Sequence, residues 1–146
     1  KHLFAWVIEN LVRNSLDAKN GKGNISCEVY MMNEKVCIDL SDTGHGIPTS
    51  KFKSVFKPGY STKKRGWGLG LSLAKRIIEE YHKGKIYVKH SKPNEETTFT
   101  SYKRVTLNYS FINCMSPSRK IIYQLRSCSL MQNAPKQNFF LWRYIP

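Results

Sequence analysis

Residues 57–78 read KPGYSTKKRGWGLGLSLAKRII, a basic segment that runs into three alternating glycines and then into a sequence of helical periodicity. Gly66, Gly68 and Gly70 lack a Cβ atom, so their backbone N–H groups can approach a ligand closely. A helix that begins after them presents unpaired N–H donors and a partial positive charge, which together favour anions. The stretch therefore predicts a phosphate-binding loop followed by an amphipathic helix.

The spacing of the apolar residues supports this helix. The spacing of the glycines excludes two common types of phosphate-binding site. Leu69, Leu73 and Ile77 recur every four residues, and Gly84 is placed to end the helix. The glycines follow G-x-G-x-G, which matches neither the P-loop pattern nor the dinucleotide fingerprint. A flexible turn before an ordinary surface helix remains the alternative.

Upstream, residues 2–18 carry an apolar stripe at helical period and are predicted to form an amphipathic helix. Asn10, Asn14 and Asp17 form a polar line beside that stripe, at i, i+4 and i+7. Asn is a mediocre helix former, so two Asn residues on the same side of one helix need an explanation. Either they face solvent, or they aim side-chain oxygens into a pocket.

Two alternating segments follow, residues 25–31 and 36–42, joined at Asn33-Glu34-Lys35, and they predict a hairpin. The alternation continues to Asp42, which points the same way as the buried residues. A buried carboxylate requires hydrogen-bond donors. The turn after it, residues 43–48, holds two glycines, so a carboxylate and an open turn could bind an exocyclic amine. Alternatively, Asp-Thr-Gly only ends the strand.

Residues 49–65 are basic and broken by Pro58-Gly59, so we expect a mobile lid rather than a continuous helix. A second pair of strand segments begins at residues 86–88 and 97–99, after the glycine-box helix. Beyond residue 100, short apolar clusters show no sustained period and no motif. We therefore expect truncation after Lys103 to leave folding and ligand affinity nearly unchanged.

The 146 residues suffice for one domain and carry a net charge of +14, yet residues 101–146 contain no Asp or Glu. The basic residues are scattered, so binding to nucleic acid is not expected. No apolar run reaches the roughly 20 residues of a membrane span, and the four cysteines form no C-x-x-C pair. These features favour a cytoplasmic protein, and the start at Lys1 suggests a fragment of a longer chain.

Four ordered motifs carry a resemblance: ENLVRNSLDA, SDTGHGIP, F-x-x-x-F and GWGLGLSLAKRII. In this order they resemble the ATP-binding domain of sensor histidine kinases, within the superfamily of DNA gyrase, heat-shock chaperones and mismatch-repair ATPases. The resemblance implies an α+β fold, a two-layer sandwich of helices on a mixed, mostly antiparallel sheet with a mobile ATP lid. It covers residues 1–100 and leaves 101–146 as an irregular tail, either foreign or disordered.

The resemblance also implies ligands, ATP and Mg²⁺, and the residues that bind them. The positions implied for ATP are Asn10, Asn14, Asp42, Gly44, Gly46, Phe56, Thr62, Lys63, Lys64, Gly66, Gly68, Gly70 and Thr98. Among them, Asn14 resembles the Mg²⁺ ligand, assisted by Asn10. Asp42 resembles the acceptor of the adenine amine, and Phe56 resembles the lid aromatic. Lys63 or Lys64 would contact the terminal phosphates, and no residue is assigned as a catalytic group.

The implied activity is transfer of the ATP γ-phosphoryl group to a histidine on a separate dimerisation domain, with a response regulator downstream. Contact with a membrane is expected only through segments upstream of Lys1. Members that hydrolyse ATP carry a Glu where this chain has Asn10, which favours a kinase. A serine-directed kinase, an ATP hydrolase, and a non-catalytic nucleotide-sensing or nucleic-acid-binding module remain alternatives. His2 and His45 are interpreted as incidental.

Overall fold

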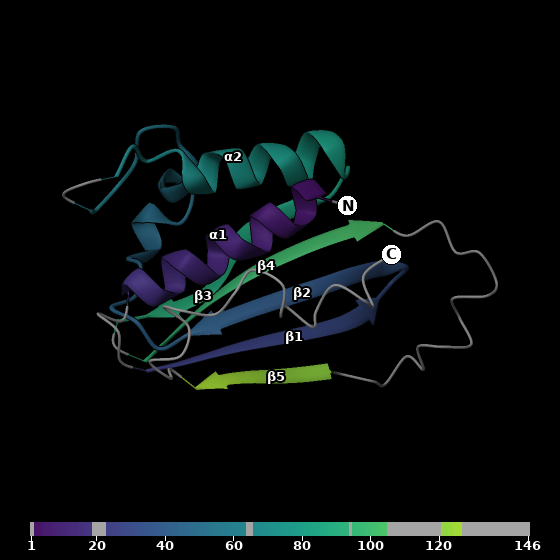
Figure 1. The fold of residues 1–146 in the computed structure, drawn as a ribbon, viewed down its shortest axis with the longest axis horizontal. Coiled ribbons are helices and arrows are strands. Elements are labelled where there is room, and N and C mark those ends of the chain that lie inside the picture. Colours follow the sequence, from purple (N-terminus) through teal and green to yellow (C-terminus); the bar gives the residue numbers. More distant parts are fainter. Residues whose placement is uncertain (1, 19–22, 64–65, 94, 105–120, 127–146) are drawn as a thin grey trace.

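The computed structural model describes residues 2–18, 23–63, 66–93, 95–104 and 121–126, the last six by their backbone alone. The chain forms α1 (His2–Ala18), β1 (Asn24–Met32), β2 (Lys35–Asp42), the 3-10 helices η1 (Thr49–Lys51) and η2 (Ser54–Phe56), α2 (Gly70–Arg76), the π-helical segment η3 (Ile77–Tyr81), β3 (Lys85–Lys92), β4 (Glu96–Arg104) and β5 (Ile121–Arg126). The helices cover one face of the sheet (Figure 1). The predicted α+β sandwich is confirmed.

In the described part of the chain, the sheet has five strands in the order β3-β4-β2-β1-β5, and each of the four pairings is antiparallel. The predicted hairpin of β1 and β2 turns through Asn33 and Glu34, whose φ angles are 47° and 58°. Two residues with positive φ are typical of the type I′ turn, whose twist suits a tight hairpin. This register places Ile25 opposite Asp42.

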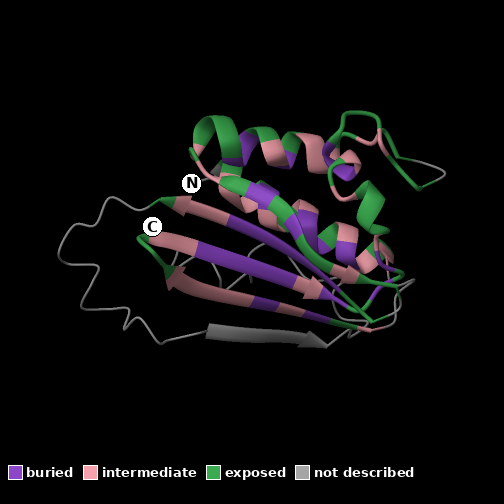
Figure 2. Cartoon of the chain, turned by 180° about the vertical axis from the view of Figure 1, so that it is seen from behind, coloured by how far each residue is buried: buried purple, intermediate pink, exposed green. Residues whose placement is uncertain are grey.

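The core lies between α1, the second helix and the sheet, and its residues are buried on facing sides of the two layers (Figure 2). α1 contributes Val7 and Leu11, whose i, i+4 spacing sets them on one side of the helix. The sheet contributes Leu40 of β2 and Phe99 of β4, which lie opposite one another and belong to the same core cluster. The predicted helical stripe and strand alternation therefore meet in one core.

The second helix begins at Gly70, as the glycine-box motif predicts, and continues from α2 into the π-helical η3. It ends before Gly84, whose N–H donates to the carbonyl of Ile78 at 2.9 Å. A Cβ atom at Gly84 would lie 2.0 Å from the carbonyl oxygen of Tyr102, so only glycine fits there. The expected helix end is confirmed.

Three expectations about irregular regions compare differently with the structure: the tail, the lid and the boundary between the domain and the tail. Within the tail, which was expected to be irregular, Ile121–Arg126 form β5 on the free edge of β1, and residues 105–120 and 127–146 lie outside the described residues. This strand gains its stability from pairing across a long sequence separation, which local periodicity does not report. The basic lid of residues 49–65 is also partly anchored, because Val55 of η2 is buried in the core. The boundary expected after residue 100 falls inside β4, which continues to Arg104.

Candidate functional site

Asp42 ends β2 on the helix-facing side of the sheet and is 3% exposed, as the strand alternation predicts. The hydroxyl of Ser15, on α1, donates to its Oδ2 at 2.9 Å, and the backbone N–H of Gly44 donates to its Oδ1 at 2.9 Å. These donors satisfy a carboxylate that would otherwise be costly to bury. They also fix its orientation between α1 and the sheet.

The glycine turn after Asp42 is held against its neighbours on both sides. The N–H of His45 donates to the carbonyl of Ala18 at 3.1 Å, and a Cβ at Gly44 would lie 2.7 Å from that of Ala18. Gly46 has φ of +79°, and its Cβ would lie 2.7 Å from the Cα of Pro93. Side chains at either glycine would push the turn away from α1 or from the β3–β4 turn.

A chain of hydroxyl groups supports the same turn from the sheet. The N–H of Ile47 donates to Ser91 Oγ at 2.8 Å, and Ser91 Oγ lies 2.8 Å from Thr97 Oγ1. Thr97 is the register partner of Asp42. The predicted Thr98 instead pairs with Ser41, with 2.7 Å between their hydroxyl oxygens. Because side chains alternate along a strand, Thr98 points to the opposite face of the sheet from Asp42.

The polar line of α1 faces the lid. Asn14 Oδ1 accepts from Lys63 Nζ at 3.0 Å, and the same ammonium forms an ion pair with the carboxylate of Asp17. The Nδ2 atoms of Asn10 and Asn14 are buried, and neither has a hydrogen-bond partner within the described ranges. Unpaired buried donors are rare, and an acceptor-rich ligand such as a phosphate would satisfy them. The structure therefore brings Asn10, Asn14 and Lys63 together.

The glycine box packs closely on this polar line. A Cβ at Gly70 would lie 2.6 Å from Asn10 Oδ1, so a larger residue at the start of α2 would displace the Asn10 side chain. Gly68, with φ of +64°, is held by Gly59, whose N–H donates to its carbonyl at 3.0 Å. Gly66 and Thr62 are exposed. Lys64 lies outside the described residues.

Phe56 is the predicted site residue whose surroundings differ most from the expectation. It is 7% exposed and packs edge-to-face on Phe99, with 6.4 Å between the ring centroids. An apolar residue in a polar stretch commonly attaches that stretch to the core. The free energy gained by burying the aromatic ring favours this position over an exposed one in the lid. Phe56 therefore attaches the beginning of the lid to the sheet.

Sequence reasoning missed three polar residues of this region: Ser15, Ser91 and Thr97. Ser15 stands within the apolar stripe of α1, and a hydroxyl at a buried position is a signal for a polar partner. Thr97 could have been found only from the register of β4 against β2. Among the described residues, no group of three or more His, Cys, Asp or Glu side chains could bind a metal. A cation here would be bound by an amide oxygen and a carboxylate oxygen of the protein, together with oxygens of water or of a bound phosphate.

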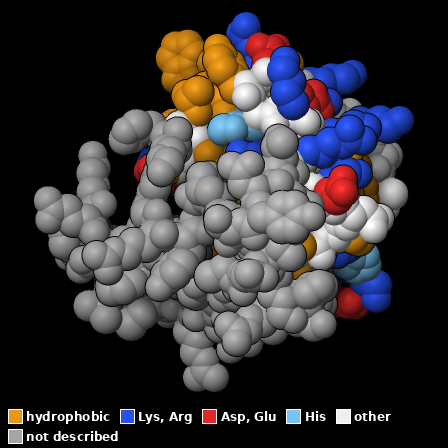
Figure 3. Space-filling model, turned by 90° about the vertical axis from the view of Figure 1, so that its right-hand side faces the viewer, with side chains coloured by type: hydrophobic (Ala, Val, Ile, Leu, Met, Phe, Trp, Pro, Cys, Tyr) orange, Lys and Arg blue, Asp and Glu red, His pale blue; other side chains and the backbone are white. Residues whose placement is uncertain are grey.

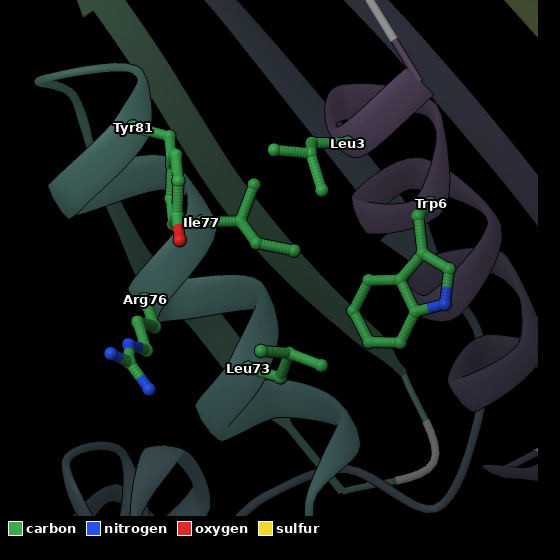
Figure 4. A pocket seen from close by; sticks show the side chains of 6 residues that line it. All are labelled: Leu3, Trp6, Leu73, Arg76, Ile77 and Tyr81. Carbon is green, nitrogen blue, oxygen red and sulfur yellow. The ribbon is translucent and has the colours of Figure 1, made fainter.

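An apolar groove lies at the other end of the helix pair. It has a volume of about 300 Å³ and is lined by Leu3, Trp6, Leu73, Arg76, Ile77 and Tyr81. Leu3 and Trp6 of α1 face Leu73 and Ile77 across the gap (Figure 4). Hydrophobic side chains gather beside Lys and Arg on this side of the helix layer (Figure 3). Its Arg76 donates to the carboxylate of Glu80 at 2.9 Å, and most of the lining is apolar, so we assign the polar ligand to the Asp42 and Asn14 region.

A second buried carboxylate, Asp39, lies on the opposite face of the sheet from Asp42. It is 6% exposed and accepts hydrogen bonds from Lys89 Nζ at 2.6 Å, Thr100 Oγ1 at 2.7 Å and Tyr30 Oη at 3.3 Å. The hydrogen bond to Asp39 raises the pKa of Lys89, and burial together with the charge of Asp39 raises the pKa of Tyr30. This cluster ties β1, β2, β3 and β4 together.

The comparisons with known proteins agree with this geometry. The family described as "Histidine kinase-, DNA gyrase B-, and HSP90-like ATPase" matches residues 2–107. Sporulation kinase C of Bacillus subtilis is 34% identical over 82 residues, which are 56% of this chain and 19% of that kinase. The signal transduction histidine-protein kinase AtoS of Escherichia coli is 36% identical over 101 residues, 68% of this chain and 16% of AtoS. The chain thus spans under a fifth of the length of either relative.

Solved structures give the same result. The catalytic domain of histidine kinase ThkA superimposes with a TM-score of 0.58 at 34% identity, covering 67% of this chain and 63% of that catalytic-domain chain. A structure of ThkA with the response regulator protein TrrA superimposes with a TM-score of 0.55 at 31% identity, over 66% of this chain and 27% of that one.

Proposed function

Because the chain belongs to the histidine kinase-, DNA gyrase B- and HSP90-like ATPase family, we propose that it is the ATP-binding catalytic part of a sensor histidine kinase. In this proposal it binds ATP with Mg²⁺ and donates the γ-phosphoryl group to a histidine on a separate dimerisation domain. The observation that carries the proposal is the buried Asp42, held by Ser15 and Gly44 between α1 and the sheet.

A fixed carboxylate of this kind can accept a hydrogen bond from the exocyclic amine of adenine. The support comes from its place beside the glycine turn, where backbone rather than side chains would border a planar base. Asn10 and Asn14 lie farther along the polar side of α1, where their unpaired Nδ2 groups would meet phosphate oxygens. Lys63 of the lid reaches the same position. Base and phosphates would therefore be recognised at separate points along α1.

Mg²⁺ fits the donor set of α1, since it takes oxygen ligands from few protein groups and borrows the remainder from phosphates and water. Asn14 Oδ1 already accepts a hydrogen bond from a cationic group, the Lys63 ammonium. When bound, the metal neutralises part of the phosphate charge, which is most of what phosphoryl transfer requires besides positioning. The side chains of α1 and the lid would hold the triphosphate in a defined orientation.

The structure also favours a kinase over a hydrolase. Hydrolysing members of the superfamily use a Glu at the position of Asn10, and the neighbouring Glu9 is engaged elsewhere. Its carboxylate pairs with Arg13 at 3.1 Å on the exposed side of α1, where Glu9 is 64% exposed. A carboxylate that faces solvent there is poorly placed to activate water beside the phosphates.

The cellular setting follows from the same proposal. The buried Cys27 and Cys37 are free thiols, which suits a reducing cytoplasm where ATP is available. None of the helices in the described part of the chain is long and apolar enough to span a bilayer. We propose a response regulator as the downstream partner, by analogy with the ThkA complex.

Phosphoryl transfer to a separately supplied dimerisation hairpin tests this function. With labelled ATP and Mg²⁺, we expect label on the histidine of the hairpin and almost none on this chain. Asn14→Ala should abolish the transfer, while Glu9→Gln, a matched change on the exposed side of the same helix, should preserve it. Phosphohistidine is labile in acid, so acid-stable label would indicate a serine-directed kinase instead. Label retained at His2 or His45 would contradict the assignment.

A further inference from the structure

Asp17 is the residue of the α1 polar line to which the proposed function gives no role. It lies three residues after Asn14, so both side chains project from the same side of the helix. Both reach one atom, because Lys63 Nζ donates to Asn14 Oδ1 at 3.0 Å and pairs with the carboxylate of Asp17. The two oxygens therefore converge on a single point that a positive group already occupies.

That position suits a divalent cation better than it suits a structural ion pair. The side chains of Lys63 and Asp17 are 42% and 47% exposed, and exposed ion pairs of this kind contribute little to stability. An amide oxygen and a carboxylate oxygen are both hard ligands, and nucleotide-bound Mg²⁺ is commonly held by one or two carboxylates together with phosphate oxygens. The two assigned asparagines provide no carboxylate.

The other carboxylates near α1 are already engaged. Asp42 is buried and accepts from Ser15 and Gly44, and Glu9 pairs with Arg13 on the exposed side of the helix. Asp17 is thus the acidic side chain that the described structure places beside Asn14. Its partner Lys63 belongs to the lid and could move to the phosphates, since its four-carbon stem is flexible.

We propose that Asp17 is a second protein ligand of the nucleotide-bound divalent cation, and that the Lys63 ammonium marks the position of this cation. The proposal rests on the proposed function, because the nucleotide supplies the remaining ligands. With Mg²⁺ held by Asn14 and Asp17, Lys63 would be free to contact the phosphate oxygens instead. Lys63 and the metal would then no longer compete for the oxygens of Asn14 and Asp17.

The test compares the affinity of the chain for a non-hydrolysable ATP analogue with and without Mg²⁺, by calorimetry. Asp17→Asn should reduce the gain in affinity due to Mg²⁺ by at least about tenfold, since losing even an outer-shell partner of a metal costs that much. The affinity without Mg²⁺ should not fall, because a negative charge near the phosphates has been removed. Glu9→Gln makes the same charge change on α1 and should leave the Mg²⁺ effect unchanged.

A second variant separates a metal ligand from a residue that only positions Lys63. Asp17→Cys should lose the Mg²⁺ effect and regain it with Cd²⁺, because a thiolate prefers the softer metal. Lys63→Met should keep the Mg²⁺ effect. An Asp17→Asn variant whose affinity changes equally with and without Mg²⁺, or does not change, would overturn the proposal while leaving the function intact. A wild-type chain that binds no nucleotide would overturn both.

Discussion

Strand β2 carries two buried carboxylates on opposite faces of the sheet, and their surroundings differ. Asp39 is surrounded by side chains of three other strands, including the ammonium of Lys89. Asp42 is held by one hydroxyl of α1 and by the backbone of its own turn. Asp39 joins strands to one another, whereas Asp42 lies where the helix layer, the sheet and a glycine turn meet. Equal burial therefore does not mean equal function, and the partners of each carboxylate separate the two.

The largest expected difference between these carboxylates is in nucleotide affinity. Asp42→Ala should weaken binding of a non-hydrolysable ATP analogue about 10- to 150-fold, because a hydrogen bond to a charged group contributes roughly 1.5–3 kcal/mol. Asp39→Ala should leave this affinity unchanged, since its side chain lies on the other face of the sheet. Calorimetric titration at a temperature well below the melting transition measures both.

Stability supplies the control for this comparison. Asp39→Ala should lower the free energy of unfolding by about 1.5–3 kcal/mol, because Thr100 and Tyr30 lose a charged acceptor, and Lys89 can still reach solvent. Urea denaturation measures that loss. Equal losses of affinity in the two variants would show that both carboxylates act only through stability, and the comparison would fail.

A smaller effect should separate the two neighbouring threonines of β4. Thr97→Val breaks the hydroxyl chain through Ser91 to the N–H of Ile47, next to the glycine turn. We expect its nucleotide affinity to fall about 2- to 12-fold, the effect of one neutral hydrogen bond of roughly 0.5–1.5 kcal/mol. Thr98→Val is the matched control, because it breaks a hydrogen bond to Ser41 on the opposite face. A larger loss in Thr98→Val would restore Thr98 as the site residue.

The threonines also show what the sequence can and cannot predict. The alternation of β2 is local, so it correctly predicts that Asp42 faces the core. The register of β4 on β2 is not local, and a shift of one residue exchanges the faces of Thr97 and Thr98. A bulge between Val88 and His90 shifts the pairing of β3 in the same way. Residue types and order were predictable here, but cross-strand neighbours were not.

The same distinction separates the elements that local patterns predict from the contacts that they do not. The helical stripe of α1 and the spacing of the glycine box depend on neighbours in sequence, and both elements form where the pattern predicts them. Phe56 and β5 depend on distant partners, Phe99 and β1, which no local pattern identifies. Likewise, nothing in the alternation of β2 indicates that Asp39 is buried. Its burial follows from Lys89, Thr100 and Tyr30, which three other strands provide.

The smallest expected difference is in how stability depends on alkaline pH. The hydrogen bond to Asp39 raises the pKa of Lys89 above its usual value of 10.5, and the pKa of Tyr30 is raised above 10.0 by burial and by Asp39. Both groups hold their protons more tightly in the folded chain than in the unfolded one. Their contribution to stability is complete below the unfolded pKa values and is lost as pH rises through the folded values.

Wild type should therefore lose stability between about pH 9.5 and pH 11 more steeply than Asp39→Asn, as measured by urea denaturation across that range. The difference should be small, because the Lys89 side chain is 49% exposed and solvent screens its charge. Burial also raises the pKa of Cys27 to about 11, so the comparison is made in a Cys27→Ala background. Asp42→Asn should retain the wild-type slope, since Lys89 and Tyr30 pair with the other carboxylate. Identical slopes in wild type and Asp39→Asn would mean that Asp39 holds the strands together through its neutral partners rather than through charge.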